Sequence, residues 1–242
     1  MKRNLLVFAM LVLGVLSLSA KDINVVIPQL SPQATETYKQ LIVAIIEATG
    51  NAAKVQVLPF ARCIYLMETG QADVESTIVQ LPDQKKWAAL KYDYSTVTAV
   101  KVAFVLYTNK NKPIDVSDLK QGNPKGYKIE TDSGHVNLFG FTAAPSTNID
   151  GSLKKLDAGN IDAYLFAQGS TDAALKRLAL KNISRQSFDT FNGVFMLTKG
   201  GRGGEIDKIV TDGMAKIKAN GKYQQIMGGY IAGASNFVDW QP

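Results

Sequence analysis

The sequence predicts an α/β protein of two lobes, with the second lobe inserted into the first. Short runs rich in β-branched residues alternate with helical patterns, which is typical of parallel sheets. This alternation is repeated as a separate series over residues 113–190. Strand-like runs at 103–108 and 191–197 flank that series. The chain would therefore cross twice between the lobes, forming a hinge beside a cleft that can close on a ligand.

The first twenty residues are predicted to be a secretory signal rather than part of the fold. Lys2 and Arg3 supply a positive start, and twelve apolar residues follow from Leu5. A membrane anchor is the alternative, but twelve apolar residues are too few to span about 30 Å of hydrocarbon as a helix. Cleavage is expected between Ala20 and Lys21. Since no cysteine lies there, the sequence predicts a periplasmic protein that is not a lipoprotein.

Composition and charge exclude several classes of function. The chain of 242 residues is 46% hydrophobic and 20% charged, as in ordinary folded proteins. Removal of the signal would take away two of the 27 basic residues. The remaining 25 basic and 21 acidic residues give a net charge of +4 instead of +6. No basic run is interleaved with aromatic residues, so no nucleic-acid partner is expected. Cys63 is the only cysteine and His135 the only histidine of the sequence. This excludes an intramolecular disulfide and a zinc site of the His/Cys type.

The first lobe is predicted to consist of residues 21–107 and 193–242. A strand–helix–strand unit over 55–81 is its central feature, and this unit builds parallel sheets. Helices are indicated by apolar residues at helical spacing that end at glycine. Strands are expected at 22–28, 55–59, 72–81, 91–107 (as two consecutive strands) and 192–201. Helices are expected at 35–50, 60–70 and 204–230, the last broken at Gly221.

The second lobe is predicted to consist of residues 108–192. A polar, turn-forming stretch at 108–113 marks its beginning. Its strands are expected at 127–131, 160–166 and 182–188. Its helices are expected at 118–121, 136–141, 151–159 and 171–180.

The end of the strand at 72–81 is a predicted part of the ligand site, because ligands of open α/β sheets bind at the carboxyl ends of strands. A central strand covered on both faces should be apolar, yet Glu75, Thr77 and Gln80 interrupt this one. Buried polar groups need partners, and a ligand is one candidate. The alternative is a strand that runs out into solvent.

Aromatic and charged residues near other strand ends extend the candidate site. Arg62 follows the strand at 55–59 and could bind an anion or hold the hinge; alternatively it is a surface arginine beside a helix start. Phe60, Tyr164 and Phe166 could offer an aromatic face to a ligand, or they belong to the core.

Small residues in the second lobe indicate a further part of the site. Ser133, Gly134 and His135 follow a predicted strand and precede a predicted helix. Backbone N–H groups at a helix start can hold an anion. The alternative is an ordinary capped helix start, with Asp132 or Ser133 as the cap.

Four phrases occur along the chain in a fixed order: LPFARCIYLMETGQADV, DLKQGNPKGYKIETDSG, SLKKLDAGNIDAYLF and IDKIVTDGMAKIKANGKYQQIMGGY. Together they resemble the periplasmic solute-binding proteins of ABC importers that carry polar amino acids. The resemblance covers nearly the whole chain after residue 20. It implies a type II periplasmic-binding-protein-like fold, with two lobes joined by two hinge strands. It also implies a monomer without cofactor or catalytic residues, which captures a small polar or anionic solute, amino-acid-like or a carboxylate, for a membrane permease.

Two positions depart from that family. Its Thr-x-x-Arg motif, whose arginine binds the α-carboxylate of the ligand, corresponds here to Pro82 and Lys85, or to Gln84 with a one-residue shift. Lysine keeps the charge but lacks the planar, two-pronged geometry of arginine. The family's aspartate for the α-amino group corresponds to Ala167. An ammonium buried without a carboxylate is costly, so an α-amino acid held in the usual way is not expected.

Two other functions are compatible with the same scaffold. One is a periplasmic enzyme resembling cyclohexadienyl dehydratase, in which Glu75, Lys85 and His135 would be the acid/base set. The other is a soluble sensor lobe that transmits its ligand state to a membrane kinase.

Overall fold

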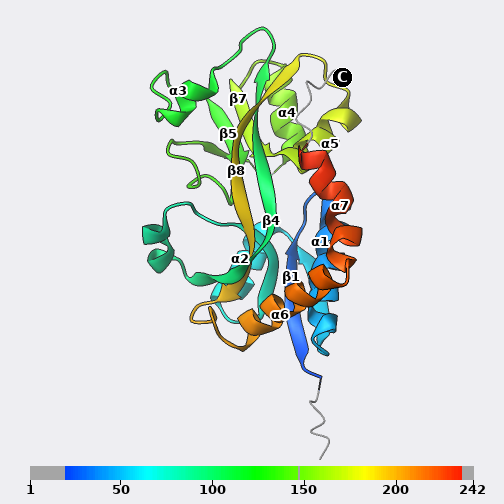
Figure 1. Ribbon diagram of the computed structural model, residues 1–242. Helices are drawn as coiled ribbons and strands as arrows, with labels where there is room; N and C mark the ends of the chain where they lie inside the picture. Colours follow the sequence, from blue (N-terminus) through cyan, green and yellow to red (C-terminus); the bar gives the residue numbers. More distant parts are fainter. Residues whose placement is uncertain (1–19, 147, 236–242) are drawn as a thin grey trace, which may run out of the picture.

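Two long antiparallel strands run side by side through the structure and join its two lobes (Figure 1). They are β4 (Tyr92–Asn109) and β8 (Ile183–Thr198), which pair along most of their length. The structure, a computed structural model, describes residues 20–146 and 148–235. The predicted signal at 1–19 and the last seven residues lie outside the described residues. One eight-stranded mixed sheet has the order β2-β1-β3-β8-β4-β7-β5-β6.

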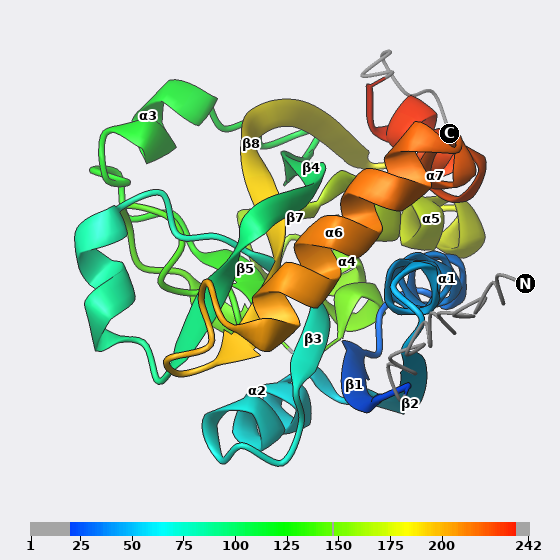
Figure 2. The same cartoon turned by 60° about the horizontal axis from the view of Figure 1, so that its bottom comes forward.

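The first lobe is built on three parallel strands beside β8. β1 (Asp22–Pro28) lies between β2 (Ala52–Leu58) and β3 (Val74–Val79). Helices α1 and α6 cover one face of these strands, while α2 covers the other (Figure 2). The helical elements of this lobe are α1 (Pro32–Ala48), α2 (Phe60–Glu68), the short 3₁₀ helix η1 (Gln84–Ala89), α6 (Glu205–Ala219) and α7 (Lys222–Ser235).

The second lobe repeats this arrangement beside β4. β5 (Ile129–Asp132) lies between β6 (Ala144–Ser146) and β7 (Ala163–Ala167), parallel to both. Its helices are α3 (Val116–Lys120), α4 (Ile149–Asp157) and α5 (Gln168–Leu178). Helix α7 leaves the first lobe and reaches α5 of the second, so it bridges the two lobes (Figure 1). Within the described part of the chain, no helix is long and apolar enough to cross a membrane.

Most predicted elements are confirmed. The unit over 55–81 forms β2, α2 and β3, and the helix predicted at 204–230 is broken at Gly221, whose φ is +78°. Such a positive φ suits glycine because it has no Cβ. The predicted lobe boundaries at 107 and 193 fall inside the continuous strands β4 and β8.

Four predictions of local structure were wrong. The two strands expected at 91–107 are one strand, β4, with irregular register at a few positions. The separate strands expected at 182–188 and 192–201 are likewise one strand, β8. Helix α1 begins at Pro32 instead of residue 35, because a first-turn proline has no N–H to leave unpaired and Ser31 caps the helix. The helix expected at 136–141 is a series of turns, whose apolar residues Phe139 and Phe141 are buried among other aromatic rings.

Candidate functional site

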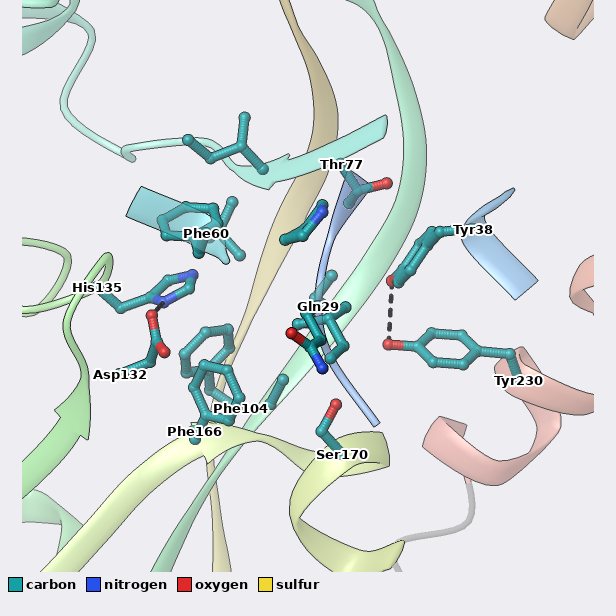
Figure 3. Close-up of a pocket in the computed structure, with 16 residues that line it drawn as sticks. Gln29, Tyr38, Phe60, Thr77, Phe104, Asp132, His135, Phe166, Ser170 and Tyr230 are labelled. Atoms are coloured by element: carbon teal, nitrogen blue, oxygen red, sulfur yellow. Dashed lines mark hydrogen bonds and ion pairs between the residues drawn. The ribbon is translucent and has the colours of Figure 1, made fainter. Parts of the chain in front are cut away.

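A cavity of about 80 Å³ lies between the two lobes, where β1, β3 and β7 end (Figure 3). We call it the inner cavity. Because the carboxyl ends of parallel strands meet at one edge of a sheet, residues far apart in the sequence come together here. Polar residues of both lobes line it: Gln29, Tyr38, Thr77, Asp132, His135 and Ser170.

A larger hollow of about 810 Å³, which we call the outer hollow, adjoins the inner cavity. The two share Gln29, Leu30, Phe60, Asp132, Phe166 and Ser170. At its edge Arg177 donates two hydrogen bonds, of 2.8 and 2.6 Å, to the carboxylate of Asp150. Arg177, the one arginine among the described residues that line the outer hollow, is therefore already paired.

Aromatic rings form the walls of the inner cavity. The ring of Phe60, at the start of α2, stacks on His135 of the second lobe with centroids 5.9 Å apart and planes 17° apart. Phe104 of β4 contacts the rings of His135 and Phe166, at 5.6 and 5.9 Å. These contacts join the lobes, so the structure has its cleft closed.

Asp132 and His135 are neighbours on one wall of the inner cavity (Figure 3). Oδ1 of Asp132 accepts the N–H of Gly134 at 2.9 Å and lies 3.2 Å from Nδ1 of His135. The backbone N–H of Ser133 donates to Ser146, and that of His135 donates to the carbonyl of Asp132. All three amides of the predicted anion-binding turn are thus engaged within the protein.

Two tyrosines form the opposite wall. Tyr38 of α1 and Tyr230 of α7 have hydroxyl oxygens 3.0 Å apart (Figure 3). Burial raises the pKa of both hydroxyls, so both stay protonated at neutral pH. Sequence reasoning missed this pair, together with Gln29, Asp132 and Ser170 as cavity residues. Strand-end position could have indicated Gln29 and Asp132, but nothing local places Tyr230 beside Tyr38.

The sequence-predicted site residues divide into two groups. Phe60, Thr77, His135 and Phe166 line the inner cavity, Ser133 lines the outer hollow together with Tyr164, and Gly134 lies against the ring of Phe60. The other four line neither space. Arg62 is exposed and lies over the ring of Tyr65 at 4.7 Å, and Lys85 is exposed on η1. Gln80 bonds Asn192 of β8 through backbone and side chain.

Glu75 is the fourth residue outside the cavity, and it is fully buried beneath α2. Within the described part of the chain, no hydrogen bond of ordinary geometry reaches either carboxylate oxygen. Burial raises the pKa of Glu75 well above its usual value, and the backbone N–H of Thr77 offsets this only in part. Nearby, burial and then Glu75 raise the pKa of the Cys63 thiol to about 12, so the thiol is not an activated nucleophile.

The proposed acid/base set does not assemble in this structure. Glu75 is buried in the first lobe, Lys85 is exposed, and His135 lines the inner cavity. Over residues 20–146 and 148–235, no group of three or more His, Cys, Asp or Glu side chains could hold a metal ion. What the geometry offers is an enclosed space between two lobes with aromatic walls and a few polar groups.

Comparisons with known proteins relate this chain to binding proteins by structure alone. No protein-family model matches it, and no curated protein sequence matches it significantly. Three solved structures are similar: a histidine kinase sensor domain with similarity to periplasmic binding proteins, an ancestral amino-acid-binding protein that is a precursor of cyclohexadienyl dehydratase, and the substrate-binding protein of an amino acid ABC transporter.

The sensor domain has a TM-score of 0.68 at 15% identity, covering 91% of this chain and 98% of its own. The ancestral protein has a TM-score of 0.66 at 16% identity, and the match covers 87% of this chain and 95% of that protein. The transporter protein has a TM-score of 0.64 at 14% identity, and the match covers 87% of this chain and 99% of that protein. Such identities show the fold alone. The chain has the two-lobe α/β fold of periplasmic binding proteins, which confirms the fold implied by its four sequence phrases.

Proposed function

We propose that this protein is a periplasmic solute-binding protein, which captures a small polar solute between its lobes and delivers it to the permease of an ABC importer. The observation that carries the proposal is the composition of the inner cavity. Phe60 comes from the first lobe, while His135 and Phe166 come from the second. A solute enclosed by both lobes stabilises the closed form, and that form is what a permease can recognise.

The hinge of this proposed motion is the pair β4 and β8. Their register shifts between Phe104 and Val105, where Phe104 also contacts rings of the second lobe. Irregular pairing interrupts the ladder and lets a strand bend. We place the lobe boundaries at this region, with residues 21–107 and 193–242 in the first lobe and 108–192 in the second.

A ligand screen tests the binding function directly. Purified protein is heated with small amino acids, carboxylates, amines, sugars and short peptides, and the unfolding temperature is recorded. A ligand at 100 times its Kd stabilises the folded state by about 2.7 kcal/mol. The absence of stabilisation by every solute class would contradict the proposal.

Two positions on α2 provide a matched pair of variants for any ligand found. Phe60 lines the inner cavity, whereas Tyr65 is 47% exposed on the same helix. Phe60→Ala is expected to weaken binding about tenfold or more, because it removes a ring from the wall. Tyr65→Ala is expected to leave affinity unchanged. Equal effects of the two variants would place the ligand elsewhere.

Sensing is a second candidate function, suggested by the fold similarity to a histidine kinase sensor domain at a TM-score of 0.68. The two roles differ in what the cell loses when the gene is deleted. Loss of uptake of the identified solute supports transport. Unchanged uptake combined with loss of a solute-dependent kinase response supports sensing.

A further inference from the structure

Resting on the binding function proposed above, we infer that the solute is a small organic cation, such as an amine or a quaternary ammonium compound. Sequence reasoning alone left a polar or an anionic solute open. The charges, rings and backbone amides around the inner cavity favour a cation over a carboxylate.

Charge is the first reason. Among the described residues that line the inner cavity, Asp132 is the one carboxylate, and none is Lys or Arg. The outer hollow adds Asp150 and Arg177, which satisfy each other through two hydrogen bonds. Among the described residues around these two spaces, Asp132 is thus the charged side chain that has no Lys or Arg partner. A cationic solute would supply such a counter-charge, beside the ring of His135 that already lies 3.2 Å from Oδ1.

The hydrogen bonding of Asp132 leaves room for that solute. Oδ1 is engaged by the N–H of Gly134 and the ring of His135. Within the described part of the chain, Oδ2 accepts no hydrogen bond. A carboxylate in a partly enclosed site is stabilised by a donor or a cation at each oxygen, so the second oxygen is a place for a ligand group.

The rings are the second reason. Phe60, Phe104 and Phe166 line the inner cavity, and Phe104 meets Phe166 edge to face with planes 80° apart. Rings set at such angles present π faces in different directions. A π face attracts a cation, most strongly where water is excluded. Figure 3 shows these rings beside Asp132, so one cationic group can contact both kinds of partner.

The turn at 133–135 is the third reason, because its backbone amides are no longer free to bind an anion. The amides of Ser133, Gly134 and His135 all donate within the protein. Ala167, at the end of β7, also lines the cavity and carries no polar side chain. A carboxylate solute would meet the like charge of Asp132, which is unfavourable.

A series of ligands with nearly the same shape separates charge from size. Choline, its uncharged isostere 3,3-dimethyl-1-butanol, and the anion 3,3-dimethylbutanoate are each titrated into the purified protein by calorimetry. Tetramethylammonium, ethanolamine and putrescine extend the cationic set. At least one cation is expected to bind, and choline is expected to bind about tenfold or more tightly than its neutral isostere. The anion is expected not to bind.

Asp132→Asn tests the residue itself. Asparagine keeps Oδ1 as an acceptor for the N–H of Gly134, so the turn is retained. The ratio of cation to isostere affinity is expected to fall about tenfold in this variant. Asp115→Asn, on an exposed helix cap, makes the same change in net charge and is expected to keep the wild-type ratio.

The possible results separate this inference from the binding function. If a neutral or anionic solute stabilises the protein and none of the four cations binds, the cation assignment is overturned while the binding function stands. Equal affinity for choline and its isostere overturns it too, as does an unchanged ratio in Asp132→Asn. If no solute of any class binds, the binding function itself fails.

Discussion

The ring of Phe60 occupies the space beside Gly134 where any larger residue would carry its Cβ. A Cβ built on Gly134 would lie 1.9 Å from Cε1 of that ring. The two residues belong to different lobes, since Phe60 begins α2 and Gly134 follows β5. In this closed cleft, a side chain at position 134 would therefore have to displace the ring of Phe60 or separate the lobes.

Gly134→Ala is expected to hold the lobes apart. The φ of Gly134 is not positive, so alanine fits the backbone and its effect is steric. We expect ligand affinity to fall about tenfold or more, and the radius of gyration with saturating ligand, measured by X-ray scattering, to stay at the open value.

Gly140→Ala is the control for this variant. It lies in the same connection, is exposed, and a Cβ there would meet nothing within 4 Å. Wild-type affinity is expected. If Gly134→Ala also binds with wild-type affinity, the functional closed form differs from the one described here.

Lys85→Ala tests the position that the family resemblance assigns to the ligand carboxylate. Lys85 is exposed and lines neither the inner cavity nor the outer hollow. The affinity measured by calorimetry is expected to change by about twofold or less, because exposed charges act weakly at a distance. A tenfold loss would bring Lys85 into the binding site.

Glu75→Gln is expected to change how stability depends on pH. Burial raises the folded-state pKa of Glu75 well above 4.5. The stability linked to the protonated group is fully present below the unfolded-state pKa and is lost as pH rises toward the folded-state value. In that window the wild type loses about 1.4 kcal/mol per pH unit through this group.

The variant lacks that loss, so its stability relative to wild type should grow as pH rises from about 5. Urea unfolding at pH 5, 6 and 7 measures the difference. Glu47→Gln, an exposed change on α1, serves as the control and should follow the wild-type curve. A Glu75→Gln curve parallel to wild type would show that Glu75 is ionised in the folded state.

Gly213→Ala is expected to destabilise the first lobe. Gly213 of α6 packs on α1, and a Cβ there would lie 2.1 Å from the carbonyl oxygen of Ile45. Because a backbone atom cannot move aside alone, the helices must separate, at a cost of about 1–3 kcal/mol or more. In α7, Gly229→Ala meets nothing within 4 Å and should stabilise the helix by about 0.5–1 kcal/mol. Melting temperatures that change in the reverse order would contradict this packing.

Local patterns determined the elements of this fold. The β-branched run at 72–81 became β3, and the glycine at 221 separated α6 from α7 as its sequence position indicates. The run at 136–141 predicted a helix but forms turns. An apolar segment of that length can be buried as turns when rings such as Phe104 and Phe188 surround it. Helical spacing in six residues does not distinguish these outcomes.

By itself, the sequence determined the α/β class, the order of most strands and helices, and Phe60, Thr77, His135 and Phe166 as residues near strand ends. Only the tertiary structure decided which of the polar residues meet. Glu75 and Thr77 lie two positions apart on β3, yet Glu75 is buried under α2 while Thr77 lines the cavity. Tyr38 and Tyr230 are 192 residues apart and share a hydrogen bond. Such contacts depend on how α7 and β3 pack against distant elements, and short-range sequence patterns carry no information about that packing.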